Sequence, residues 1–258
     1  MKTRLFTAAA VATLLISAAC SQEPQAPVSA PEMSPAIVVN EVADGYYAHV
    51  LATSPETAYF SGIDLDRHDG LFDNSLEAVA ANEALIDAML ARLQTVDADD
   101  MVGDPAWITY AYLREELEAK VGVRVCRTEI WNVNQMGGWH SGYAQVAQLQ
   151  PVCTAELREQ SLARWSKFAG LIDQELDNLG AGIKRGYTAP KTVVQRVIDQ
   201  IDGLLALDVE QSPFYSPAAR DDDEAFAEAT RSIVVEQITP ALKRYREFLA
   251  GPYLEQAR

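Results

Sequence analysis

Histidine and cysteine carry much of the catalytic and metal-binding chemistry of proteins, and this chain has few of either. Its 258 residues include three histidines and three cysteines, and no two histidines stand at the spacing of metal ligands on one helix face. The motifs HExxH, GxSxG, Walker Gly-Lys and GxGxxG are also absent. We therefore predict no catalytic residue and no metal ligand in this sequence. The histidines are His49, His68 and His140.

Acidic residues are numerous, but their spacing favours structural roles. The run Asp64 to Gly70 alternates oxygen-bearing side chains as a calcium loop does, yet its glycine comes one place late and no glutamate follows at the ligand position. A turn stabilised by aspartates is the favoured interpretation. Neighbouring carboxylates on a helix point in different directions, so residues 115–118 predict a solvated face and residues 221–224 a loop leading into a helix.

His140 is the most site-like histidine, because it follows Trp139 and two adjacent glycines. Adjacent glycines favour turns, so residues 134–140 are expected to be irregular. With no nucleophile or ligand at a recognisable spacing, a structural hydrogen bond is a better interpretation of His140 than catalysis.

The N-terminus predicts export and lipid attachment. In residues 1–19, two basic residues precede an apolar stretch too short to span a bilayer, which is typical of a signal peptide. Small residues then end in Cys20, the expected site of lipid attachment; the alternative is an ordinary signal peptide with an incidental cysteine. Ser21 favours the outer membrane, facing the periplasm. Prolines and few bulky apolar residues make residues 20–35 a flexible tether between membrane and domain.

Cys126 and Cys153 remain as an even pair in an exported protein, where disulfides persist. A disulfide between them is the favoured prediction. Two buried free thiols, or a metal site that also uses His140, are the alternatives left open.

The charge balance excludes one class of partner. With 37 acidic and 21 basic residues the formal net charge is −16. Nucleic-acid binding requires clustered lysine and arginine to displace counterions from phosphates, so no nucleic-acid partner is expected.

Apolar residues in the body of the chain recur every three or four positions, the periodicity of amphipathic helices. We predict an all-α fold, a multi-helix bundle of about six main helices in one domain over residues 36–258. One segment, Val121 to Val133, has a V-G-V-R-V run and is expected to be extended. Pro240 predicts a kink or the meeting of two helices. Each predicted helix has one apolar stripe, a row of apolar residues on a single helix face. The six stripes lie in residues 39–50, 76–93, 107–121, 157–179, 194–205 and 226–249.

Several segments together resemble a known family. NQMGG at 134–138, GYTAPKTVVQRVIDQID at 186–202, SPFYSP at 212–217 and ITPALKRYREFLAGPYLEQAR at 238–258 follow the lipoprotein-like start in the family's order. They resemble the N-terminal half of the bacterial family called domain of unknown function 885. The match runs from about residue 36 to residue 258.

The resemblance implies an exported protein, often a lipoprotein, of a family regarded as gluzincin-type zinc metallopeptidases with a largely helical fold. Family members are about twice this length, and their zinc motif lies in the C-terminal half, so no ligand or catalytic glutamate carries over to this chain. Zinc is expected only with that half. The loop formed by Asn134, Gln135, Gly137 and Gly138 is a possible wall of the substrate cleft; a tight connection that requires glycine is the alternative.

Three hypotheses of function follow. The first is a non-catalytic N-terminal portion of a metallopeptidase-like envelope lipoprotein, inactive alone, whose partners are the membrane through its lipid, and a peptide substrate or a separately encoded C-terminal half. The second is a stand-alone lipoprotein that binds a peptide or protein partner. The third is a self-sufficient enzyme, for which no acid–base constellation is found. Under the first, the last apolar stripe is expected to be incompletely buried: Ile238, Leu242, Tyr245 and Leu249.

Overall fold

The computed structural model describes residues 34–258, and these fold almost entirely as helices with no strand among them. The all-α prediction is confirmed, but nine helices of ten or more residues are present in this part of the chain, where about six were expected. The nine are α1 (Pro35–Thr53), α3 (Leu76–Leu93), α4 (Trp107–Val123), α5 (Trp139–Leu149), α6 (Ala155–Trp165), α7 (Phe168–Lys184), α8 (Lys191–Leu205), α10 (Glu224–Ile233) and α11 (Thr239–Phe248).

The predicted number was too low because two stripes each cover two helices. The stripe over 157–179 is divided into α6 and α7 at Ser166 and Lys167, and the last stripe contains α10 and α11. In addition, α5 begins at Trp139, directly after the adjacent glycines, where an irregular segment was expected through His140.

Short elements connect these helices. The α-helical ones are α2 (Thr57–Ser61), α9 (Ser216–Ala219) and α12 (Leu254–Gln256). The 3-10 turns are η1 (Asp99–Met101), η2 (Arg124–Cys126), η3 (Thr128–Ile130), η4 (Val209–Gln211) and η5 (Pro213–Tyr215). Two π-helical turns, η6 (Val234–Ile238) and η7 (Leu249–Tyr253), precede and follow α11.

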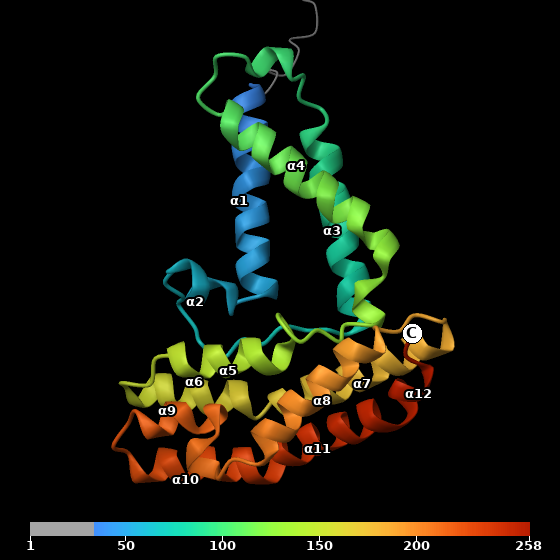
Figure 1. The fold of residues 1–258 in the computed structure, drawn as a ribbon. Coiled ribbons are helices and arrows are strands. Elements are labelled where there is room, and N and C mark those ends of the chain that lie inside the picture. Colours follow the sequence, from blue (N-terminus) through green and yellow to red (C-terminus); the bar gives the residue numbers. More distant parts are fainter. Residues whose placement is uncertain (1–33) are drawn as a thin grey trace, which may run out of the picture. The chain divides into compact units, whose positions relative to one another are not determined.

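Two apolar cores lie within residues 34–258, and Figure 1 shows the helices that enclose each of them. Helices α1, α3 and α4 bury one core, with Val39, Ile86 and Leu117 at its centre. Helices α5 to α11 enclose a larger one, where Trp165 and Phe168 are almost wholly buried. The region between the two groups of helices is where the candidate site described below lies.

Aromatic rings organise the larger core. The ring centroids of Trp165 and Phe168 are 5.5 Å apart and those of Phe168 and Tyr143 are 5.0 Å apart, both pairs edge to face. Phe214 completes the cluster, 5.1 Å from Phe168. Such pairs contribute about 0.5–1.5 kcal/mol each beyond area burial, so α5, α6 and α7 are held in one arrangement.

The prediction of an extended segment over 121–133 is wrong. Helix α4 continues through Val123, and the turns η2 and η3 follow it, separated by Arg127 with φ of 50°. The β-branched residues favour a strand, but an isolated strand would leave its backbone groups unpaired, and helical turns satisfy them locally.

The expectation at Pro240 is confirmed. Helices α10 and α11 meet through the π-helical turn η6, and Pro240 lies in the first turn of α11. Proline has no N–H to donate, so the widened turn before it accommodates the break in the hydrogen-bond ladder.

The expectation that the last stripe is incompletely buried is wrong. Ile238 and Leu249 are 0% exposed, Tyr245 1% and Leu242 3%. These side chains belong to the larger core, because α11 packs on α7 and α8. Their burial removes the argument that this face needs a cover from outside the chain.

Among the helices of residues 34–258, none has both the length and the apolar character to cross a bilayer. The predicted signal peptide, the lipid site at Cys20 and nearly all of the tether over 20–35 lie outside the described residues.

Candidate functional site

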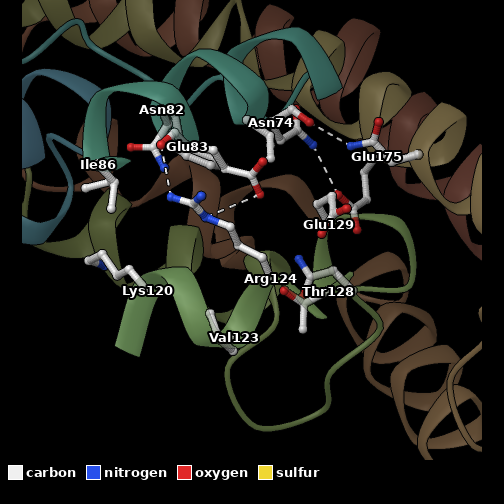
Figure 2. A pocket seen from close by; sticks show the side chains of 14 residues that line it. Asn74, Asn82, Glu83, Ile86, Lys120, Val123, Arg124, Thr128, Glu129 and Glu175 are labelled. Carbon is white, nitrogen blue, oxygen red and sulfur yellow. Dashed lines mark hydrogen bonds and ion pairs between the residues drawn. The ribbon is translucent and has the colours of Figure 1, made fainter. Parts of the chain in front are cut away.

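A cleft of about 360 Å³ opens between α3, the end of α4, η3 and α7 (Figure 2). Its size falls in the range of small-molecule and peptide sites. It is lined by Phe72, Asn74, Val79, Asn82, Glu83, Ile86, Lys120, Val123, Arg124, Thr128, Glu129, Asn132, Glu175 and Asn178.

Two residues of α7 form the inner wall of this cleft. Glu175 and Asn178 lie on the face that α7 turns to the segment before α3, because residues three apart share a helix face. The Asn178 Nδ2 group donates to the backbone oxygen of Asn74 at 2.6 Å. Asn74 in turn donates from Nδ2 to Glu175 Oε2 at 3.1 Å and to the Leu171 backbone oxygen at 3.2 Å. This network fixes the segment that leads into α3 against α7.

Glu175 is the most unusual ionisable group of the cleft. Glu175 is 2% exposed, and its Oε1 atom has no hydrogen-bond partner among residues 34–258. No ion pair in residues 34–258 includes it. Burial disfavours the charged form and raises the pKa of Glu175 to about 7, although the hydrogen bond from Asn74 lowers it. The carboxyl is therefore ready to change its charge near neutral pH.

The cations on the outer wall are already paired. Arg124 Nη1 lies 2.8 Å from Asp87 Oδ1, and Arg124 Nη2 donates to the Glu83 backbone oxygen at 2.9 Å. Lys120 Nζ lies 3.3 Å from Glu116 Oε1. Figure 2 shows Arg124 directed toward Glu83, on the side of the cleft away from Glu175.

A second hollow of about 510 Å³ adjoins the first and extends it toward α1. There Tyr46 donates to Glu116 Oε1 at 2.8 Å, and the His49 Nε2 and Asn82 Oδ1 atoms are 2.6 Å apart. The two hollows are neighbours along α3 and are together called the groove, because five residues line both: Phe72, Val79, Asn82, Ile86 and Lys120.

The loop of Asn134, Gln135, Gly137 and Gly138 is a tight turn. Asn134 Oδ1 accepts from the backbone N–H groups of Met136 at 2.8 Å and Gly137 at 3.2 Å. A Cβ on Gly138 would collide with the Asn134 backbone oxygen, so glycine is required there. The loop borders a neighbouring hollow of about 270 Å³, which shares Thr128 and Asn132 with the Glu175 cleft. The loop itself does not line the Glu175 cleft.

His140 has a structural environment. It is 3% exposed, its Nε2 lies 3.0 Å from Gln200 Oε1, and burial lowers its pKa. Gln200 also donates to the Gln135 backbone oxygen at 2.9 Å. The pair His140 and Gln200 therefore fastens the loop to α8.

The Asp64 to Gly70 run is held by polar side chains of α6. The fully buried Arg164 donates to the Gly70 backbone oxygen at 2.7 Å and to the Tyr59 hydroxyl at 2.8 Å. Gln160 Oε1 accepts from the His68 backbone N–H at 2.6 Å. No group of three or more His, Cys, Asp or Glu residues within 34–258 is placed to hold a metal ion.

The two acidic clusters of the sequence are engaged in ion pairs and capping. Glu118 pairs with Arg114 at 2.9 Å, and Asp221 with Arg158 at 3.0 Å. Asp223 caps α10 by accepting from the Phe226 backbone N–H at 2.9 Å.

The structure does not contain the predicted disulfide. Cys126 and Cys153 are both free and exposed, which also corrects the alternative of buried thiols. They lie in different surroundings: Cys126 shares a hollow with Tyr187 and Arg258, whereas Cys153 lies near Arg158. An even number of cysteines in an exported chain gives no information on the distance between the two sulfurs.

A family model describing bacterial proteins of unknown function, DUF885, matches residues 55–258. The chain belongs to this family. The resemblance drawn from the four sequence segments is thereby confirmed. The search of curated proteins gives no match.

A solved structure of the same fold is "The crystal structure of the putative lipoprotein from Colwellia psychrerythraea". The two superpose with a TM-score of 0.72 at 14% identity, over 88% of this chain and 43% of that one. The DUF885 chain studied here therefore spans less than half the length of that protein, and the likeness establishes the fold.

Sequence analysis missed Glu175 and Asn178, although one signal was present. Glu175 interrupts the apolar stripe of α7, three positions after Ile172 and four before Leu179, both wholly buried. A carboxylate on a buried face is rare unless it is paired or functional.

Proposed function

We propose that residues 34–258 are a non-catalytic helical portion of a metallopeptidase-like lipoprotein of the bacterial envelope, and that they hold a peptide substrate in the cleft beside Glu175. The observation that carries the proposal is the cleft itself, in which one oxygen of a buried carboxyl, Glu175 Oε1, has no hydrogen-bond partner among residues 34–258. Membership of the DUF885 family is consistent with it.

The lining suits an extended peptide. Asparagine side chains offer both donors and acceptors, as the peptide backbone does, and Asn82 and Asn132 place them on two sides of the cleft. Val79 and Val123 supply apolar surface between these groups. The adjoining hollow lengthens the groove so that several peptide residues fit in a row.

The proposed role is binding because the described residues do not fit a zinc site. Zinc hydrolysis needs three protein ligands, an open position and a general base. Residues 34–258 offer no cluster of three candidate ligands, so no step through a metal is derived for this chain. In this proposal zinc and the general base come from a C-terminal half, within the same protein or encoded separately.

The proposed location is the outer membrane, facing the periplasm, through a lipid on Cys20. The support is the sequence pattern of residues 1–21. Residues 20–35 would then act as a tether, because proline-rich segments are extended and semi-rigid.

The alternative is a stand-alone envelope lipoprotein that binds a peptide or protein partner. Exposed apolar side chains on α4 favour it, since Ile108 is 78% exposed and Tyr112 69%. The mass of the lipidated product in membranes distinguishes the two: a product of this chain alone favours the alternative, and a longer product favours the first proposal.

Peptide binding is tested by calorimetry on the full mature chain with Cys20→Ser, using tetraalanine and longer alanine-rich peptides. We expect binding without cleavage. Val123→Lys, which places a charged side chain in the cleft, should weaken binding at least tenfold. Val235→Lys is the matched control, because the two valines are 54% and 51% exposed and Val235 does not line the cleft.

Absence of binding by every peptide at millimolar concentration would overturn the binding role. Equal loss in both lysine variants would overturn the assignment to this cleft. Cleavage of the peptide by the purified chain that persists with a chelator would overturn the non-catalytic role.

A further inference from the structure

The geometry points to Glu175 as the receptor for a primary ammonium group of the bound ligand, supplied by a peptide N-terminus or by a lysine side chain. This inference rests on the proposed peptide-binding function and specifies its chemistry. It is carried by three features of the cleft. These are the fixed orientation of the carboxyl, the lack of a hydrogen-bond partner for its Oε1 atom, and the pairing of the nearby cations with other carboxylates.

The Glu175 carboxyl is held in a fixed orientation. Asn74 donates to Oε2 at 3.1 Å, and Asn74 is itself fixed by Asn178 through the 2.6 Å bond to its backbone oxygen. Figure 2 shows Asn74 and Glu175 beside each other, on the side of the cleft away from Lys120. A receptor of this kind needs no rearrangement of its own side chain when a ligand arrives.

The second oxygen of the carboxyl is buried without a partner. No group within residues 34–258 forms a hydrogen bond with Oε1. A buried acceptor without a partner is costly, so such groups in native proteins call for an explanation. A donor supplied by a ligand would satisfy Oε1 and leave the bond from Asn74 unchanged.

Within the part of the chain that the structure describes, no cation is placed to neutralise Glu175. Arg124 and Lys120 line the same cleft, but Arg124 pairs with Asp87 and Glu83, and Lys120 pairs with Glu116. The other ionisable groups near Glu175 are Tyr245 and Tyr253, whose pKa values burial and the Glu175 charge raise, so both are neutral at pH 7. A cation that pairs with the ionised Glu175 would therefore come from the ligand.

The lining as a whole selects a cation. Three carboxylates and two cationic groups border the cleft, and the third carboxylate, Glu129, already pairs with Arg127 at 2.6 Å. An anionic ligand would meet an excess of negative charge. An ammonium is compact and has three donors, and Thr128 and Asn132 offer oxygen atoms in the same cleft for the donors that Glu175 does not accept.

The test compares three peptides by calorimetry at pH 8 with the full mature chain. The peptides are tetraalanine amide with a free N-terminus, its N-acetylated form, and an N-acetylated form in which one alanine is lysine. We expect the free amine to bind at least tenfold more tightly than the acetylated peptide without lysine. Recovery of affinity by the lysine peptide would identify the side chain as a second source of the ammonium.

Glu175→Gln should abolish the preference for the free amine over the acetylated peptide. Glu118→Gln is the matched control and should keep the preference, because Glu118 pairs with Arg114 and does not line the cleft. Glu175→Asp retains the carboxyl group and should keep part of the preference for the free amine. Denaturation curves of each variant verify folding.

Equal binding of free and acetylated peptides by the wild-type chain would overturn this inference and leave the proposed peptide-binding function intact. A preference that survives in Glu175→Gln would also overturn it. Absence of binding by all three peptides would overturn both proposals together. The wild-type comparison decides the inference even where a variant fails to fold.

Discussion

Asn178 on α7 donates to the backbone oxygen of Asn74 at 2.6 Å, across a separation of 104 positions in the sequence. Together with the bonds from Asn74 Nδ2 to Leu171 and Glu175, this bond joins the segment before α3 to α7. The inner wall of the cleft therefore depends on the two amides of Asn74 and Asn178.

Replacing the Asn178 amide should weaken the fold. Asn178→Ala leaves the buried Asn74 oxygen without a partner, and we expect a loss of about 1–3 kcal/mol in the free energy of unfolding. Gln195→Ala is the control, because Gln195 bonds Asp199 on an exposed face and should lose less than about 0.5 kcal/mol. Urea denaturation measures both, and equal losses would contradict the role given to Asn178.

The raised pKa of Glu175 predicts how stability depends on pH. Because burial raises the pKa from 4.5 to about 7, the folded state binds the proton more tightly than the unfolded state. The stabilisation by the proton is complete below pH 4.5 and is lost as the pH rises through about 7. Over this range the proton on Glu175 contributes about 3 kcal/mol to the free energy of unfolding.

The comparison of wild type with Glu175→Gln isolates this effect, since glutamine does not titrate. The difference in unfolding free energy between the two proteins should shift by about 3 kcal/mol in favour of the variant between pH 4.5 and pH 8. Urea denaturation at a series of pH values gives the difference. A constant difference over this range would show that the pKa of Glu175 is ordinary.

Alanine substitutions at two glycines, one in the loop at 134–138 and one in α5, are predicted to have opposite effects on stability. Gly138→Ala should destabilise by about 1–3 kcal/mol, because its Cβ would meet the Asn134 backbone oxygen and the His140 ring. Gly142→Ala lies in α5 with nothing within 4 Å of its Cβ and should stabilise by about 0.5–1 kcal/mol. Thermal denaturation of both decides; a tolerated Gly138→Ala would mean that the turn is not tight.

The free cysteines predict a thiol count. Cys126 and Cys153 are exposed, so a thiol reagent should modify both in the native Cys20→Ser chain without denaturant. Mass spectrometry should find two adducts per molecule. Finding none, with both appearing only after reduction, would restore the disulfide that the sequence predicts.

Local features of the fold were predictable where short-range physics decides. Thr154 caps α6 by accepting from the Leu157 backbone N–H at 3.2 Å, and Pro190 directly precedes α8; both residue types are favoured at helix starts. The kink before Pro240 follows from its missing N–H. Apolar periodicity identified helices, but it could not divide the 157–179 stripe at Ser166, because the phase of the stripe is nearly unchanged across that break.

The candidate site was not predictable from motifs, because its parts come from distant segments. Asn74 precedes α3, Arg124 follows α4 and Glu175 lies within α7. Only the interruption of an apolar stripe by Glu175 was visible in the sequence. The disulfide was predicted from cell-compartment chemistry, which carries no geometric information on Cys126 and Cys153.

The most direct test of the account is the pKa of Glu175, read by NMR from the carboxyl carbon of the full mature chain with Cys20→Ser. The account predicts a value of about 7 in the free protein, and a decrease when tetraalanine amide is added, because an ammonium stabilises the ionised carboxylate. A value near 4.5 that does not change with peptide would contradict both the unpaired burial of Glu175 and its role in binding.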